Sequence, residues 1–407
     1  MIYRTIYEKV LRSIQTKPIT IITGSRQVGK STLCKEFVKK HGYNYVSLDN
    51  SRELASAKND TAMFLKEHRA PLIIDEVQKC EELFVELESI VNDVRFNDLD
   101  NKGMYILTGS QSYNLMKNVT ESMAGRVSVI TMSPLSLREI KGIKEIPFLI
   151  DPVKNNDDAI NNPYSVDEVY EYIVRGFYPE IYDLNIDDID QFYSDYVMSY
   201  IERDVSQIIN LKDKLKFQRF MEIIASSTGE ELVYDSIAKG IGVTVPTIES
   251  WISVLVSGNI ITLLEPYYEN SVVKRVVKRP KIIFNDTGLA AFLSGLNNPI
   301  VLKKSQFRGR FVETFIINEI IKSYKNNGKQ AKFYYYRDSE QREIDLIVLH
   351  EGYLNLIECK SGVSFNASDI KAFDQLKNTK YVISNSGIVC NTDVSYALKE
   401  GFYAVPI

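Results

Sequence analysis

Residues 24–31 read Gly-Ser-Arg-Gln-Val-Gly-Lys-Ser, the pattern of a phosphate-binding loop. The two glycines let the backbone curl so that successive N–H groups point at one anion. Lys30 can then reach the β- and γ-phosphates, and the Ser31 hydroxyl can bind Mg²⁺. The apolar run 19–22 predicts a buried strand before the loop, and residues 31–38 predict a helix whose positive end lies under the phosphates. A chance glycine-rich turn is the alternative.

We therefore expect ATP and Mg²⁺ to bind here. Eight of the nine residues expected to contact the nucleotide lie in or next to the loop, and the ninth follows a later predicted strand. They are Gly24, Ser25, Gln27, Val28, Gly29, Lys30, Ser31, Thr32 and Ser110.

Two acids, Asp75 and Glu76, end a second apolar run. We expect Asp75 to hold the Mg²⁺ shell together with Ser31, and Glu76 to orient or activate the attacking water, as in a hydrolase rather than a nucleotide kinase. Two solvated acids that cap the next helix are the alternative. A third predicted strand ends in Thr108-Gly109-Ser110, whose hydroxyls would lie between the two motifs and could sense the γ-phosphate, although these residues also make ordinary turns.

Arg126 stands between a predicted helix and the predicted strand 127–130. An arginine at this place could act as a finger on the transferred phosphate, in its own chain or across the interface of a homo-oligomer. The alternative is an exposed charge at the edge of a strand.

Composition limits the classes of protein that the chain can belong to. A length of 407 residues allows two or three domains, and 44% hydrophobic with 25% charged residues is typical of a soluble protein. We see neither a run of 18 apolar residues nor a signal peptide, so we expect a cytoplasmic protein without a membrane partner. Four scattered cysteines and three histidines favour neither a zinc site nor disulfides.

The pattern along the chain predicts an α/β protein in four parts. Alternating strands and helices predict a P-loop ATPase core with a parallel sheet, and the polar, breaker-rich stretch 151–163 predicts a loop that leads into a helical lid. The expected parts are the AAA-type core at 1–145, the linker and lid at 146–212, a winged helix at 213–300 and an α/β domain at 301–407. The last part carries 15 Lys and Arg against 12 Asp and Glu residues, a net charge of +3 that permits nucleic acid as a partner.

The winged helix is predicted from a short helix, a glycine-containing turn and a second amphipathic helix. The strands 260–264 and 274–279 would form its wing, in which Lys and Arg residues could bind phosphates. The second helix has no Lys or Arg between Thr247 and Leu255, so a module that only packs or binds a partner is the alternative.

Two apolar runs near the C-terminus flank a Glu351-Gly352 turn and predict an antiparallel hairpin. Setting His350 opposite Tyr353 places Asp345 opposite Glu358. Two carboxylates about 5 Å apart on one face repel each other, and a cation between them would remove that cost.

A divalent metal is the natural occupant of such a pair. Asp345 and Glu358 would bind it, Glu313 from a predicted helix could add a third carboxylate, and Lys360 could steady an attacking water or the developing charge. The alternative is a salt-bridged face in which Lys360 neutralises both acids as structure alone.

Several short segments together resemble one family. Residues 26–30, 75–78, 124–126 and 134–136 are similar to the AAA-type ATP-binding core of a widespread prokaryotic family whose C-terminal half is a domain of unknown function. Residues 176–179, 284–289 and 309–313 are similar to that family's later landmarks.

The resemblance implies a C-terminal domain of the restriction-endonuclease-like PD-(D/E)XK fold. Its acid, Glu-x-Lys and helical glutamate correspond to Asp345, Glu358, Lys360 and Glu313, while Ile344 replaces the proline of the motif name. We therefore predict a Mg²⁺-dependent ATPase coupled to a metal-dependent nuclease-like domain that acts on DNA. The alternative is a nucleotide-driven switch whose C-terminal domains bind DNA or protein without cleavage.

Overall fold

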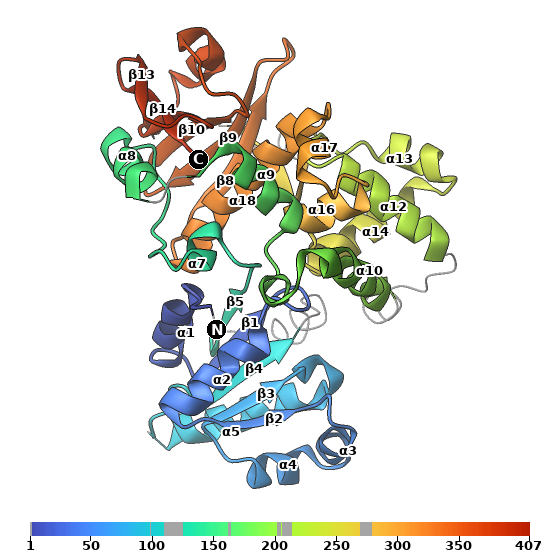
Figure 1. The fold of residues 1–407 in the computed structure, drawn as a ribbon. Coiled ribbons are helices and arrows are strands. Elements are labelled where there is room, and N and C mark those ends of the chain that lie inside the picture. The colour runs from blue at the N-terminus through green and yellow to red at the C-terminus, as the bar shows by residue number, and fades with distance from the viewer. Residues whose placement is uncertain are drawn as a thin grey trace. The chain divides into compact units, whose positions relative to one another are not determined.

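The computed structural model describes residues 2–97, 99–109, 125–161, 164–201, 205, 214–268 and 279–407. The chain divides into two compact units (Figure 1). The first unit contains residues 1–144 with 178–180 and 257–260, and the second contains residues 145–177, 181–256 and 261–407. The boundaries of the four parts expected from the sequence remain a prediction.

The first unit is built on a five-stranded parallel sheet with the order β2-β3-β4-β1-β5. The predicted parallel α/β sheet is confirmed. Its strands are β1 (Ile19–Thr23), β2 (Asn44–Ser47), β3 (Leu72–Asp75), β4 (Tyr105–Gly109) and β5 (Val127–Thr131). Every residue of β1, β3 and β4 is buried, as the continuous apolar runs of a sheet covered on both faces require.

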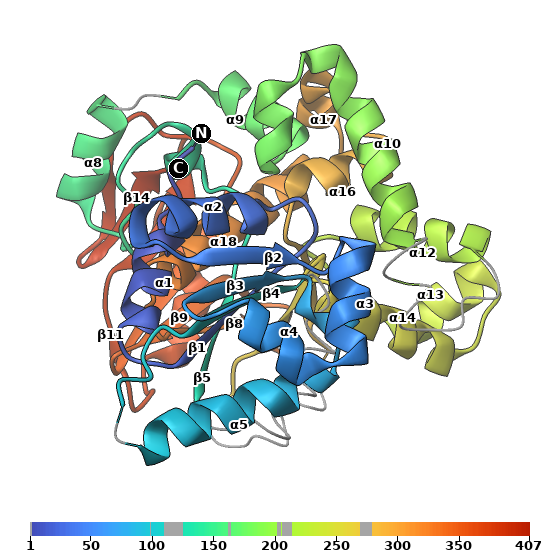
Figure 2. The same ribbon diagram turned by 90° about the horizontal axis from the view of Figure 1, so that it is seen from below.

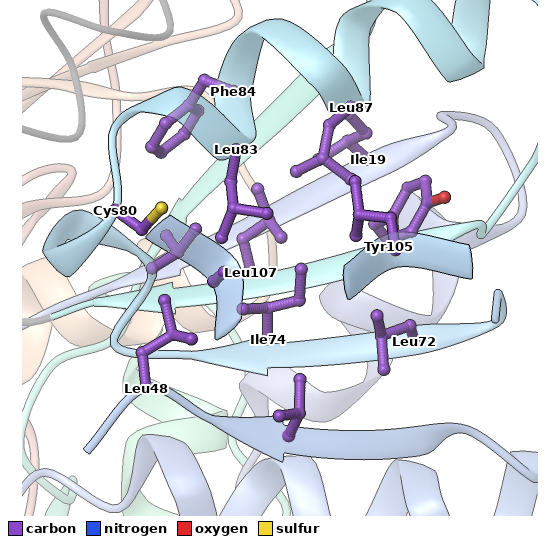
Figure 3. Close-up of a cluster of buried hydrophobic side chains, with 14 of the residues drawn as sticks. Ile19, Leu48, Leu72, Ile74, Cys80, Leu83, Phe84, Leu87, Tyr105 and Leu107 are labelled. Carbon is purple, nitrogen blue, oxygen red and sulfur yellow. The ribbon is translucent and has the colours of Figure 1, made fainter. Parts of the chain in front are cut away.

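Helices cover both faces of this sheet, with α2 (Lys30–His41) and α5 (Glu82–Phe96) on opposite sides (Figure 2). The core under α5 brings Leu83 and Leu87 against Ile74 and Leu107 of the central strands (Figure 3). The remaining helices of the unit are α1 (Ile6–Ile14), α3 (Ser51–Asn59), α4 (Thr61–Glu67), η1 (Val77–Lys79) and α7 (Leu137–Ile140).

The second unit begins with helices that pack on one another. In it, α9 (Val166–Arg175) contacts α16 (Thr287–Leu293) and α17 (Pro299–Lys304). Further described helical segments of this unit are α8 (Pro152–Asn161), η3 (Ile186–Asp188), α10 (Ile189–Tyr200) and α12 (Lys214–Ser226), while η2 (Pro179–Asp183) begins in the first unit.

The prediction of a loop at 151–163 is wrong for most of that stretch, because α8 occupies residues 152–161. The carboxylate of Asp151 accepts hydrogen bonds from the backbone N–H groups of Val153 and Lys154, each at 3.2 Å, and so caps the helix start. The helix lies along β14 (Phe402–Pro406) (Figure 1). None of its residues is buried, so its sequence needs no apolar stripe.

Helices α13 (Tyr234–Ile241) and α14 (Val245–Ser257) meet at 105°, within the range of a helix-turn-helix. Strands β6 (Ile261–Pro266) and β7 (Lys281–Phe284) follow as an antiparallel pair. Of the predicted basic strand 274–279, only Arg279 lies within the described residues. Across the described ranges no single helix is long and apolar enough to cross a membrane, and the bent α13–α14 pair passes that test only when its two helices are taken together.

A mixed sheet with the order β13-β14-β12-β10-β9-β8-β6-β7 ends the chain, and the short strand β11 also pairs with β10. Its strands β6 and β7 precede the long helix α18 (Arg308–Asn326), and the other strands follow it. Its further elements are β8 (Lys332–Arg337), β9 (Glu343–His350), β10 (Tyr353–Cys359), η5 (Ala367–Leu376), β11 (Val382–Ile383), β12 (Ser386–Cys390) and β13 (Tyr396–Lys399). β9 and β10 form the predicted hairpin, with Tyr353 opposite His350 as expected.

The two later landmarks around Gly176 and Gly288 pack against each other. The buried Asp286 accepts hydrogen bonds from the N–H groups of Phe177 and Leu289, each at 2.7 Å, and from the Tyr193 hydroxyl at 3.0 Å. A Cβ on Gly288 would lie 2.2 Å from that hydroxyl oxygen, so no larger residue fits there. These segments therefore hold the helical part of the second unit together.

Candidate functional site

The phosphate-binding loop connects β1 to α2, with the expected strand before it and helix after it. Gly24 and Gly29 have φ values of 144° and 94°, and a Cβ on Gly24 would lie 2.3 Å from the carbonyl oxygen of Met132. Lys30 donates hydrogen bonds to the carbonyl oxygens of Gly24 and Ser25, each at 2.8 Å. The Ser25 hydroxyl is buried with no hydrogen-bond partner among the described residues. This cradle fits the phosphates of a nucleotide.

Asp75, at the end of β3, joins the two nucleotide motifs. Its carboxylate accepts hydrogen bonds from the hydroxyls of Ser31 at 3.0 Å and Tyr45 at 2.8 Å, and from Thr108. Ser31 and Asp75, the two expected Mg²⁺ ligands, therefore lie side by side. Sequence reasoning missed Tyr45, because only the order of the strands brings β2 next to β3.

Glu76 follows Asp75 with a left-handed backbone, at a φ of 57°. Its carboxylate accepts a hydrogen bond from the Gln78 amide, and its N–H group lies 3.4 Å from the Thr108 hydroxyl. Burial raises the pKa of Glu76, while Gln78 and Lys30 act in the opposite direction. A carboxylate of raised basicity at the carboxyl end of β3 suits the expected work on water. β4, which carries Thr108, lies between β1 and β3, as a role of Thr108 in sensing the γ-phosphate requires. Ser110 lies outside the described residues.

Arg126 lies at the amino ends of the parallel strands, whereas the phosphate-binding loop lies at their carboxyl ends. It precedes β5, whose first residue Val127 pairs with Ile19 at the start of β1, whereas the loop follows the end of β1. Its side chain contacts Asn92 at 2.7 Å and Glu88 at 3.2 Å on α5. The five residues of β1, at about 3.3 Å each, separate the amino ends of the strands from their carboxyl ends. The prediction that Arg126 acts on the phosphate of its own chain is therefore wrong. Its action across a subunit interface stays a prediction.

In the C-terminal sheet, Asp345 and Glu358 converge with Lys360. The pairing of β9 with β10 ends at Leu346 and Ile357, one pair before the predicted pair of Asp345 and Glu358, and the N–H group of Cys359 donates to Asp345 Oδ2 at 2.8 Å. Lys360 Nζ lies 2.5 Å from Glu358 Oε1 and 3.9 Å from Asp345 Oδ2. The second carboxylate oxygen of Glu358, Oε2, is buried without a hydrogen-bond partner among the described residues. Burial and the Asp345 charge raise the pKa of Glu358 well above its usual range.

Lys281, which sequence reasoning missed, lies among the same carboxylates. Its Nζ is 2.7 Å from Glu313 Oε1 and 3.9 Å from Asp345 Oδ1, and it also pairs with Glu343. Its side chain is only 3% exposed. Burial lowers the pKa of Lys281, but Glu313, Asp345 and Glu343 raise it by more, so the lysine stays charged.

Glu313 of α18 reaches the acid cluster as predicted, and Glu343 joins it. Oxygen atoms of Glu313, Glu343 and Asp345 lie within 4.8 Å of one another, close enough to share one metal ion. Burial, followed by the Asp345 charge, raises the pKa of Glu313 to about 8. The period of two along a strand could have found Glu343, which lies two residues before Asp345 on the same face.

Comparison with known proteins identifies the first part of the chain. Residues 16–141 match the model of an AAA domain. This part of the chain is an AAA-type P-loop domain. Downstream of the AAA-type domain, residues 166–300 and 308–407 match two domains of unknown function, DUF8612 and DUF4143.

Other proteins and solved structures are similar to parts of this chain. The uncharacterized proteins Rv2008c of Mycobacterium tuberculosis and Mb2031c of Mycobacterium bovis are each 23% identical over 84% of this chain and 69% of their own. Among solved structures, the Walker-type ATPase paby2304 of Pyrococcus abyssi covers 71% of this chain and 94% of its own at 14% identity, with a TM-score of 0.37. The Holliday junction branch migration motor RuvB of Thermotoga maritima covers 63% and 88% at 15% identity, with a TM-score of 0.32.

Proposed function

We propose that the AAA-type domain hydrolyses ATP and that residues 301–407 form a Mg²⁺-dependent phosphodiesterase that acts on DNA. One observation carries the second part of this proposal. The carboxylates of Asp345 and Glu358 converge beside Lys360, and one buried oxygen of Glu358 has no partner among the described residues.

In the AAA-type domain each expected residue has a distinct part. Lys30 binds the β- and γ-phosphates, and Ser31 with Asp75 orients the Mg²⁺ that accompanies ATP. Glu76 accepts a proton from the attacking water, a role that its raised pKa favours. Thr108, hydrogen-bonded to Asp75, connects the state of the phosphates to β4.

The charges of the C-terminal cluster fit a divalent cation. Four carboxylates, those of Glu313, Glu343, Asp345 and Glu358, lie within reach of three cationic side chains, Lys281, Lys360 and Arg337. With all four ionised, negative charge would be left over in a largely buried place, where it is costly, and this is why burial and the Asp345 charge raise the pKa values of Glu313 and Glu358. Ligation would also stabilise the charged forms of Glu313 and Glu358, whose raised pKa values show how poorly burial tolerates them.

Asp345 and Glu358 would hold the metal, with Glu313 and Glu343 as further oxygen donors from the helix and the strand. A metal bound there supplies Lewis acidity and lowers the pKa of a bound water. Lys360 stabilises charge that develops on the phosphate. This assignment keeps all the roles that the resemblance implies for Asp345, Glu358, Lys360 and Glu313.

A second candidate function has its own observation in Lys281. The Lys281 ammonium already neutralises Glu313 and Glu343, as it would in a purely structural ion cluster. The C-terminal part would then bind DNA or protein without cleavage, and the protein would be a nucleotide-driven switch.

Labelled DNA distinguishes the two functions. Purified protein is incubated with it in Mg²⁺ or in chelator, with and without ATP. Asp345→Ala is the test variant, and Glu340→Ala, which removes an exposed acid from the turn between β8 and β9, is the control. We expect cleavage that needs Mg²⁺, survives in Glu340→Ala and disappears in Asp345→Ala. Intact DNA in every wild-type reaction favours the switch.

A further inference from the structure

A basic pocket opens beside the acid cluster, within the second unit. Its volume is about 280 Å³, and α9, the α17–α18 region and the segment after β10 contribute to it. The lining residues that matter here are Tyr170, Lys303, Arg308, Lys360, Ser361 and Phe365. Neither the family models nor the predicted roles account for Lys303, Arg308 or Tyr170.

The three cations of this pocket come from separate parts of the chain. Lys303 Nζ pairs at 2.6 Å with the exposed Asp167, and the Lys303 side chain is itself 42% exposed. Arg308 is exposed and makes no ion pair with any residue that the structure describes. It begins the 19-residue helix α18, whose first turn contains no acid, so the helix dipole adds to the positive potential.

Lys360 links the pocket to the acid cluster. It lines the cavity, and its Nζ also contacts Glu358 and Asp345. A ligand in the pocket therefore lies next to the proposed metal site. Ser361 adds a hydroxyl, Phe365 adds an aromatic side chain of the kind on which nucleic-acid bases stack, and the buried side chain of Tyr170 forms part of the wall.

We infer that this pocket binds one phosphate-bearing nucleotide of a single DNA strand, beside the phosphodiester that the acid cluster would cleave. The inference rests on the proposed function, and it narrows the substrate to strands with an unpaired nucleotide. A volume near the lower end of small-ligand sites, about 300 Å³, admits one nucleotide but not a duplex. Lys303, Arg308 and Lys360 bind its phosphate.

Binding is measured in chelator, so that no strand is cut, by the fluorescence anisotropy of a labelled 5′-phosphorylated oligothymidylate. All proteins carry Lys30→Ala, which removes the phosphate contact of the AAA-type domain. Lys303→Ala and Arg308→Ala should each weaken binding about 3- to 10-fold. The slope of the logarithm of the binding constant against the logarithm of the salt concentration should become shallower by about 0.7 per charge removed. Arg308→Lys, which keeps the charge, should retain most of the affinity.

The matched control is Lys304→Ala, one residue beyond Lys303, because Lys304 is exposed and does not line the pocket. It should change affinity less than about twofold. Equal losses in Lys303→Ala and Lys304→Ala, or unchanged binding by the Lys303→Ala/Arg308→Ala double variant, would overturn the inference. Melting curves of each variant confirm that the losses do not come from unfolding.

Three competitors identify the source of the phosphate. Unlabelled single strand should displace the probe, while thymidine monophosphate at the same nucleotide concentration and blunt duplex should displace far less. Displacement by the mononucleotide as effective as by the strand would replace the inferred strand site by a free-nucleotide site. The binding assay does not depend on cleavage, so the two proposals can fail separately. If binding depends on Lys303 and Arg308 but the protein does not cut DNA in Mg²⁺, the proposed nuclease activity is refuted and the proposed strand-binding pocket stands.

Discussion

Lys281, the first residue of β7, and Glu313, in α18, form a buried ion pair whose Nζ and Oε1 atoms lie 2.7 Å apart. The two residues are 32 positions apart in the chain. They fall in the two regions that match different domains of unknown function, residues 166–300 and 308–407. A cation from one matched region thus completes the acid cluster of the other.

Replacing Lys281 should expose this dependence. Lys281→Met leaves the carboxylates of Glu313 and Glu343 buried without their counter-ion, so in chelator the free energy of unfolding should fall by about 3–5 kcal/mol. Mg²⁺ should restore part of the loss. Lys332→Met, at an exposed position of strand β8 in the same sheet, is the control and should stay within about 0.5 kcal/mol. Denaturant unfolding with and without Mg²⁺ gives both values, and equal stability of Lys281→Met and wild type in chelator would contradict the ion-pair role.

Glu313 should make stability fall as pH rises in the absence of metal. Its pKa is about 8 in the folded protein, against 4.5 for an unperturbed glutamate. The unfolded chain loses this proton first, so the stabilisation is complete below pH 4.5 and is lost as pH rises towards 8. The slope is at most about 1.4 kcal/mol per pH unit for this group. Glu313→Gln should flatten the pH profile of unfolding in chelator, whereas Glu340→Gln, at an exposed position, should leave it unchanged.

Asp345→Asn separates a metal site from a structural ion cluster. The asparagine keeps an oxygen that can accept from the Cys359 N–H group, and it removes the charge that raises the pKa values of Glu313 and Glu358. Metal affinity and DNA cleavage should collapse, while the melting temperature in chelator should stay level or rise. A marked loss of stability in chelator would mean instead that Lys360 and Lys281 need Asp345 as a structural partner.

Lys30 and Glu76 should affect ATP turnover in different ways. Lys30→Ala loses a charged phosphate contact, so nucleotide affinity should fall. Glu76→Gln keeps the shape of the side chain and loses the base, so it should bind ATP while turnover falls by about 10²-fold or more. Equilibrium nucleotide binding and phosphate release measure the two effects. Hydrolysis by Glu76→Gln at the wild-type rate would refute the assignment of Glu76 as the catalytic base.

Arg126 can act on ATP only across a subunit interface, because it lies at the amino ends of the strands. Arg126→Ala should bind ATP normally and hydrolyse it poorly. Mixing it with Lys30→Ala, which keeps Arg126 but lacks the phosphate contact, should restore part of the activity if the finger acts in trans. Specific activity should also rise with protein concentration. No restoration in the mixture, with full activity of a demonstrated monomer, would leave Arg126 as a tie between β5 and α5 through Asn92 and Glu88.

The sequence alone determined the features that short stretches of backbone control. The glycines of the phosphate-binding loop, the acids Asp75 and Glu76 after a buried strand, and the register that sets Asp345 towards Glu358 all follow from local geometry. A turn of fixed length determines every pair in a hairpin, which is why the β9–β10 register was predictable from residues 344–358. In α8, by contrast, polar composition concealed a helix that the Asp151 cap begins and that β14 supports.

Only the tertiary structure decided which distant segments share a site. Lys281 and Tyr45 reach their carboxylate partners because strand order brings β7 near α18 and β2 next to β3, and nothing in their local sequence records this. The same holds for the pocket of Lys303, Arg308 and Lys360, and for the placement of Arg126 far from the phosphate-binding loop of its own chain. The spacing of residues along the chain predicts which side chains lie together within one helix, strand or hairpin. The packing of these elements determines which distant charges neutralise one another in the folded protein.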